Sequence, residues 1–63
     1  MKALKIIQCS DILMWYSQRV GATVIYLGEE DGIYWSREPA GYKNIILKQD
    51  AIIVEVADAG ETI

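Results

Sequence analysis

The apolar residues of this chain fall in short runs rich in Ile, Val and Tyr, and Gly or Asp separates the runs at intervals of about ten residues. Short runs of this kind indicate strands, because β-branched and aromatic side chains fit a pleated sheet. The pattern predicts an all-β domain, a small five-stranded sandwich or barrel. We expect its strands at residues 2–8, 22–27, 33–37, 42–47 and 51–56.

Alternation within the first and last of these strands predicts which side chains form the core. In residues 2–8, Leu4 and Ile6 share one face, whereas Lys5 and Ile7 share the other. On the last strand, we expect the core face to carry Ile52, Val54 and Val56. Three isoleucines are left for outward faces: Ile7, Ile45 and Ile53.

Glycine, proline and acidic residues mark the connections between the strands. Residues 28–32 are a polar, glycine-bracketed segment in which Asp31-Gly32 is a strong turn signal, so the second and third strands are expected to pair as a hairpin. A turn between the third and fourth strands follows from Pro39, which fixes φ, and from Gly41, which tolerates positive φ. The second, third and fourth strands would then form an antiparallel meander.

The connection after the first strand, residues 10–20, supports two interpretations. One is a long ordered loop, which we favour because Trp15 and Tyr16 suit such a segment. The other is a single helical turn, capped by Ser10-Asp11, that carries Ile12, Leu13 and Tyr16.

The chain is long enough for one small domain. Its 63 residues are 52% hydrophobic and 24% charged, a balance that excludes disorder. We expect the domain to span residues 1–56, with a 3₁₀ turn at residues 48–50 before its last strand. Residues 57–63 have no pairing pattern and are expected to form a flexible C-terminal tail. The apolar content exceeds what the inward faces of five short strands hold, so some apolar side chains should lie on the surface.

The net charge of −3 and the lack of a Lys/Arg cluster argue against binding of nucleic acid through its phosphates. Residues 1–7 hold too short an apolar run for a secretory signal, and no run approaches the about 20 residues of a membrane span. We therefore expect a cytoplasmic chain with no nucleic-acid or membrane partner. The one cysteine, Cys9, suggests a reducing compartment and is expected to pack as a small hydrophobe.

The residues that many enzymes use at neutral pH are missing. The chain has no His and one Cys, which excludes Ser/His/Asp and Cys/His catalysis, an intramolecular disulfide and a Cys/His zinc site. The acidic turn Glu29-Glu30-Asp31 lacks the ligand alternation of a calcium loop and is expected to be a solvated hairpin tip. A chain of this size also has little room for a substrate pocket. We therefore expect no catalytic residue, no cofactor and no metal.

Six aromatic side chains are the main candidates for an interaction surface, since Trp and Tyr dominate the energetics of protein interfaces. The competing interpretation for each ring is that it closes a core that aliphatic side chains cannot fill alone. Tyr34 and Trp35 are adjacent in one strand, so only one of them can point inward, and Tyr26 is expected to pair with an exposed aromatic across the sheet. The expected protein-binding patch consists of Trp15, Tyr16, Tyr34, Trp35, Pro39 and Tyr42.

Several segments resemble a pattern in small, uncharacterised bacterial and phage-encoded proteins. The pattern combines Trp15-Tyr16, Val20-Gly21, an aromatic strand ending in Arg37-Glu38-Pro39-Ala40-Gly41-Tyr42, and Lys48-Gln49-Asp50-Ala51. The resemblance covers residues 2–56 and implies an SH3-like β-barrel of phage or prophage type, without an activity. The predicted order, with a long first connection and a 3₁₀ turn before the last strand, is also that of an SH3-like barrel. Signalling SH3 domains carry an Ala-Leu-Tyr-Asp-Tyr segment that this chain lacks, so their recognition of Pro-rich peptides is not implied.

Three functions compete on these grounds. The leading hypothesis is a non-catalytic protein-binding module, a phage or prophage accessory factor that modulates a host protein by direct contact. The alternative is a structural protein that self-associates into a homo-oligomer through edge strands and exposed Ile and aromatic side chains. The third is stacking of nucleic-acid bases on the aromatic rings, which the negative net charge disfavours.

Overall fold

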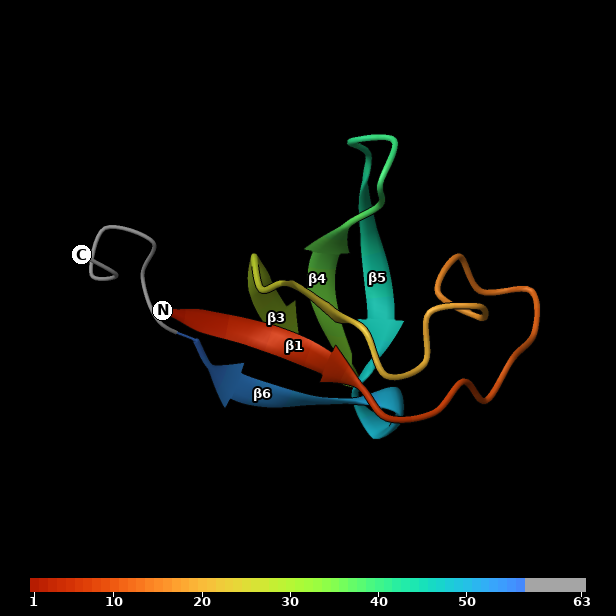
Figure 1. Cartoon of the computed structure of the whole chain (residues 1–63), viewed down its shortest axis with the longest axis horizontal. Coiled ribbons are helices and arrows are strands. Elements are labelled where there is room, and N and C mark those ends of the chain that lie inside the picture. The colour runs from red at the N-terminus through yellow and green to blue at the C-terminus, as the bar shows by residue number, and fades with distance from the viewer. Residues whose placement is uncertain (57–63) are drawn as a thin grey trace.

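In the computed structural model, residues 1–56 are described and form two three-stranded antiparallel sheets that share a core (Figure 1). The first sheet has the order β2-β1-β6 and consists of β1 (Lys2–Ile6), β2 (Thr23–Ile25) and β6 (Ala51–Glu55). The second has the order β3-β4-β5 and consists of β3 (Gly28–Glu30), β4 (Ile33–Arg37) and β5 (Lys43–Leu47). The all-β class and the 3₁₀ turn, η1 (Lys48–Asp50), are confirmed. The tail expected at residues 57–63 lies outside the described residues.

The central strand of the first sheet is β1, and its faces agree with its pattern. Leu4 and Ile6 are fully buried, whereas Lys5 between them is exposed. The register sets Leu4 between Val24 of β2 and Ile53 of β6. Leu4 and Ile6 therefore fix the inner face of the whole sheet.

The core-facing side of β6 is not the one that its pattern predicts. Leu4 pairs with Ile53 and Ile6 pairs with Ala51, and residues directly opposite each other share a face. Ala51 and Ile53 therefore face the core, and Ile52 lies on the outer side, where it is 46% exposed. The core face was predicted to carry Ile52, Val54 and Val56. That prediction was wrong because both alternating sets of this strand are apolar, so only its register with β1 distinguishes them.

The strand expected at residues 22–27 is shorter, and the chain passes to the second sheet after it. Residues of β2 pair with β1, whereas Gly28 to Glu30, expected to be part of a turn, pair with β4 as β3. The antiparallel meander is thus formed by β3, β4 and β5, and residues 22–27 are not part of it. Gly28 has a φ of 146°, which is strained for any residue with a Cβ. Glycine at this position allows the chain to turn from one sheet into the other.

Both tight turns of the second sheet lie where the sequence predicts them. Asp31 and Gly32 form the two-residue turn between β3 and β4, and Gly32 has a φ of 82°. Between β4 and β5, the Gly41 N–H donates to the Glu38 carbonyl at 2.8 Å, which closes the turn around Pro39.

The first connection, residues 7–22, is a loop of successive turns, which confirms the loop interpretation. Its first turn starts at Asp11, whose carboxylate accepts the Leu13 N–H and whose carbonyl accepts the Met14 N–H, both at 2.9 Å. Ile12 and Leu13 point to solvent, with exposed fractions of 83% and 88%. No helix in the described residues is long and apolar enough to cross a membrane.

The core joins both sheets to this loop. Its fully enclosed side chains are Leu4, Ile6, Tyr16, Ile46 and Ala51. Half-buried side chains pack around them: Cys9, Met14, Trp15, Val24, Tyr26 and Tyr34. Tyr16 is the one loop residue in the buried set, so the loop contributes to the core through an aromatic ring.

Candidate functional site

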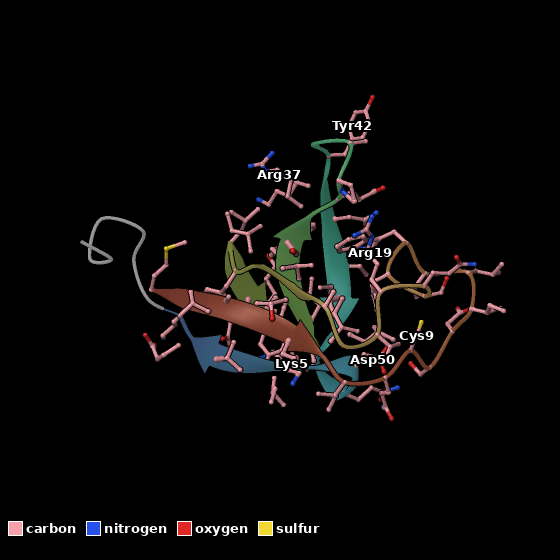
Figure 2. The ribbon with its side chains drawn as sticks, viewed as in Figure 1. Lys5, Cys9, Arg19, Arg37, Tyr42 and Asp50 are labelled. Carbon is pink, nitrogen blue, oxygen red and sulfur yellow. The ribbon has the colours of Figure 1, made fainter. Side chains whose placement is uncertain are left out.

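Asp50, the last residue of η1, is a fully buried carboxylate. It accepts hydrogen bonds from Tyr16 Oη at 2.6 Å, from Ser10 Oγ at 2.9 Å and N at 3.2 Å, and from Gln8 Nε2 at 3.2 Å. Burial on its own raises the pKa of Asp50, but the donors together outweigh burial and hold the pKa below its usual value. Asp50 is therefore an ionised anchor that ties the first loop to η1 (Figure 2).

Tyr16 belongs to this buried network and is absent from the surface. Its side chain is fully buried, and its hydroxyl also accepts the Leu47 N–H at 3.2 Å. Burial and the hydrogen bond to Asp50 raise the pKa of the Tyr16 hydroxyl. The expected place of Tyr16 in an exposed binding patch is thus corrected, because the loop directs this ring between the sheets.

The edge strand β5 has backbone groups that point away from β4, and its ladder identifies them. The Glu38 N–H donates to the Tyr42 carbonyl, and the Lys48 N–H donates to the Gly32 carbonyl, at the two ends of the ladder. In an antiparallel ladder, hydrogen-bonded pairs alternate with non-bonded pairs. From either end of the ladder, this alternation places Lys43, Ile45 and Leu47 in non-bonded pairs. The backbone N–H and C=O groups of these three residues therefore point away from β4.

The Trp15-Tyr16 pair covers this edge of β5. The Trp15 indole N–H donates to the Ile45 carbonyl at 2.8 Å, and the Leu47 N–H donates to the Tyr16 hydroxyl. The two rings are edge-to-face, with centroids 5.6 Å apart. Trp15 therefore has a structural contact that accounts for its position, since a covered edge cannot pair with another strand.

Tyr34 faces the core side of the second sheet. It lies opposite the fully buried Ile46, and its ring meets Tyr26 edge-on, with centroids 6.2 Å apart. The aromatic partner expected for Tyr26 is thus Tyr34, although both rings are half-buried against the core. Glu29 joins this pair to Lys48, because it accepts the Tyr26 hydroxyl at 2.9 Å and binds the Lys48 ammonium at 3.0 Å. The hydrogen bonds from Lys48 and Tyr26 lower the pKa of Glu29.

Trp35 lies on the other side of the same sheet, as its position next to Tyr34 requires. It pairs across the strands with Ile45, and Ile33 pairs with Leu47. All four side chains are half-buried, and none belongs to the core cluster or to the side chains packed against it. We call this outer surface the Trp35 face and define it by Ile33, Trp35, Ile45 and Leu47.

The Trp35 face has a basic end and an acidic end. At the β4–β5 hairpin, Arg37 and Lys43 lie directly opposite each other, and the Lys43 ammonium is 4.9 Å from the centre of the Trp35 ring. The Arg37 guanidinium donates to the Gly41 carbonyl at 2.9 Å, a neutral acceptor. At the opposite end, Glu30 lies opposite Ile33 and is exposed.

Pro39 and Tyr42 lie at the turn of the β4–β5 hairpin. Tyr42 is 71% exposed and points away from the sheets (Figure 2). The residues predicted to form one patch therefore occupy separate places. Tyr16 and Tyr34 lie on the core side, Trp15 on the β5 edge, Trp35 on the outer face, and Pro39 and Tyr42 at the hairpin tip.

The predicted patch does not include the aliphatic neighbours of Trp35, although Ile45 was expected on an outward face, and Asp50 was not expected to be buried. The neighbours of Trp35 could have been predicted from the hairpin turn at Pro39. This turn sets the register of the two strands, which places Ile45 opposite Trp35 and Leu47 opposite Ile33. The burial of Asp50 could not have been predicted, because a polar residue in a short polar segment predicts exposure.

Within residues 1–56 there is no pocket and no group of three or more His, Cys, Asp or Glu side chains that could hold a metal ion. Comparison of the chain with protein-family models, curated proteins and solved structures finds no match. The surfaces of the two sheets are therefore the available grounds for a functional proposal.

Proposed function

We propose that this chain is a non-catalytic protein-binding module that contacts its partner through the Trp35 face. The observation that carries the proposal is the position of Trp35 and its three aliphatic neighbours, side by side on the sheet face that turns away from the core. A Trp ring among aliphatic side chains is typical of interface hot spots, and its burial by a partner is favourable.

The charges at the ends of this face define the chemistry of the partner. Arg37 and Lys43 stand together at the hairpin end, and no salt bridge within residues 1–56 involves either of them. A partner segment that places apolar side chains over Trp35 and carboxylates beside the two cations would complement this surface. We therefore propose a partner with an apolar and acidic binding segment.

We include the SH3-like barrel and the phage or prophage origin in this proposal. Three features support the barrel: the long first loop, the passage between sheets at Gly28, and η1 directly before β6. The resemblance to small bacterial and phage-encoded proteins then suggests an accessory factor that modulates a host protein. The lone Cys9 suits a reducing, cytoplasmic environment.

Capture of partners from a bacterial lysate tests this proposal. Immobilised wild-type chain is compared with Trp35→Ser and with Tyr42→Ser, which removes an exposed ring from the hairpin tip. We expect Trp35→Ser to reduce capture at least about tenfold, and Tyr42→Ser to retain it. Thermal unfolding of both variants controls for loss of fold. Equal capture by the wild type and Trp35→Ser would contradict the proposal.

A further inference from the structure

Strand β6 forms one edge of the first sheet, and its outward backbone groups can be assigned in the same way as those of β5. The Ile7 N–H donates to the Asp50 carbonyl at 2.8 Å, and the Val56 N–H donates to the Met1 carbonyl at 2.9 Å, at the two ends of the β1–β6 ladder. Alternation between these bonds directs three sets of N–H and C=O groups away from β1. They belong to Ala51, Ile53 and Glu55.

Within the part of the chain that the structure describes, no side chain bonds this edge as Trp15 and Tyr16 bond the edge of β5. Within residues 1–56, no hydrogen bond involves the outward backbone groups of Ile53 or Glu55, whereas the Ala51 N–H closes the last 3₁₀ turn of η1. The strand also contains no Lys or Pro to block pairing with another strand. Ile52 and Ile53 add apolar surface beside the edge, with exposed fractions of 46% and 37%.

We propose that two copies of this chain pair through β6, which joins their three-stranded sheets into one continuous sheet. An antiparallel pair about a two-fold axis at Ile53 sets this residue opposite itself and sets Ala51 opposite the partner's Glu55. In that register the outward N–H and C=O groups of Ile53, the N–H of Glu55 and the C=O of Ala51 meet outward groups of the other strand, which forms about four hydrogen bonds.

The side chains of β6 fit a second copy in this register. On the outer face, the exposed Ile52 lies beside the partner's half-buried Val54, so these two apolar side chains cover each other. On the inner face, the two Ile53 side chains contact each other. Each shields the other, which is 37% exposed in the single chain, from solvent. Glu55 lies opposite Ala51, so no like charges face each other. If the register slipped by one residue, the outward N–H and C=O groups of one strand would no longer lie opposite those of the other. The core-facing side chains of one copy would then lie on the same side as the outer side chains of its partner.

Sedimentation equilibrium of the full chain, up to its highest soluble concentration, tests this pairing. We expect a dimer, with twice the chain mass of 7.1 kDa. Ile53→Lys places two like charges on the axis and should raise the dissociation constant at least about tenfold. The matched control is Ile12→Lys, which makes the same change in charge at an exposed loop position and should leave the dimer intact.

A second variant separates pairing from folding. Chemical synthesis with N-methyl isoleucine at Ile53 removes one outward N–H but keeps the side chain and the hydrogen bonds to β1. We expect it to weaken the dimer without lowering the unfolding temperature of the monomer. A wild-type chain that stays monomeric, a dimer that survives both changes at Ile53, or a dimer that forms only when residues 57–63 are removed would overturn the proposal. Trp35→Ser should not affect the dimer, so this test is independent of the Trp35 face.

Discussion

The Asp50 carboxylate connects two segments that are distant in sequence, the first loop and η1. Its donors are one side-chain amide, one backbone N–H and two hydroxyls, and no cation compensates its charge within residues 1–56. A buried carboxylate stays ionised in such a place only while these donors stay in position. The network therefore links the ionisation of one residue to the structure of the loop.

This arrangement predicts how Asp50→Asn changes stability with pH. Because folding lowers the pKa of Asp50 below its unfolded value of about 3.9, its contribution is present at higher pH and is lost as the pH falls through the folded pKa. We expect Asp50→Asn to lower the free energy of unfolding by about 1–3 kcal/mol near neutral pH.

Urea unfolding over a pH series measures this effect, with Asp31→Asn in the exposed hairpin turn as the control. The difference between wild type and Asp50→Asn should shrink as the solution becomes acidic, whereas Asp31→Asn should stay close to the wild type throughout. A difference for Asp50→Asn that is independent of pH would show that the charge of Asp50 does not contribute.

Among the elements, β5 depends on the first loop for the cover of its edge. Trp15→Phe keeps an aromatic ring but removes the indole N–H that bonds the Ile45 carbonyl. We expect the free energy of unfolding to fall by about 1 kcal/mol and the Leu47 N–H to exchange faster with solvent. Hydrogen exchange followed by NMR measures both effects, and Trp35→Phe on the outer face is the control. Unchanged exchange at Leu47 would show that Trp15 does not hold this edge.

The passage from the first sheet to the second depends on the backbone of Gly28. Apart from Gly28 and its two chain neighbours, no residue has an atom within 4 Å of the position that a Cβ would take there, so the cost of a side chain comes from its φ of 146°. We expect Gly28→Ala to lower the free energy of unfolding by about 1–3 kcal/mol. D-alanine at the same position prefers positive φ and should restore most of that loss. Equal destabilisation by both alanine forms in thermal unfolding would refute a conformational cause.

The sequence predicts the elements better than it predicts how they face one another. Five of the six strands, the positions of both hairpin turns and the 3₁₀ turn follow from local signals such as Asp31-Gly32 and Pro39, whereas β3 was expected to be part of a turn. The inner face of β6 does not, because Ile52 and Ile53 are equally apolar and a partner strand decides between them. The change of sheet at Gly28 is hidden for the same reason, since a local pattern does not show which strand a segment pairs with.

At the scale of the whole molecule, the two proposed interaction surfaces lie on different sheets. The Trp35 face belongs to the second sheet, and the outward edge of β6 belongs to the first. The excess of apolar residues in the composition predicts that such surfaces exist, but the aromatic rings alone do not locate them. Tyr16 and Tyr34 lie on the core side because a residue of another element holds each of them there. Tyr16 donates a hydrogen bond to Asp50, and Tyr34 pairs across the strands with Ile46.

Site-specific photo-crosslinking tests the central claim, binding through the Trp35 face, most directly. A photoreactive leucine analogue replaces either Leu47, on that face, or Leu13, an 88% exposed leucine of the first loop. The chain is made by chemical synthesis, mixed with a bacterial lysate and irradiated. We predict a crosslinked protein from position 47 that is absent from position 13 and is lost when Trp35→Ser is added. Crosslinks from position 13 alone, or crosslinks from position 47 that persist in Trp35→Ser, would contradict binding through this face.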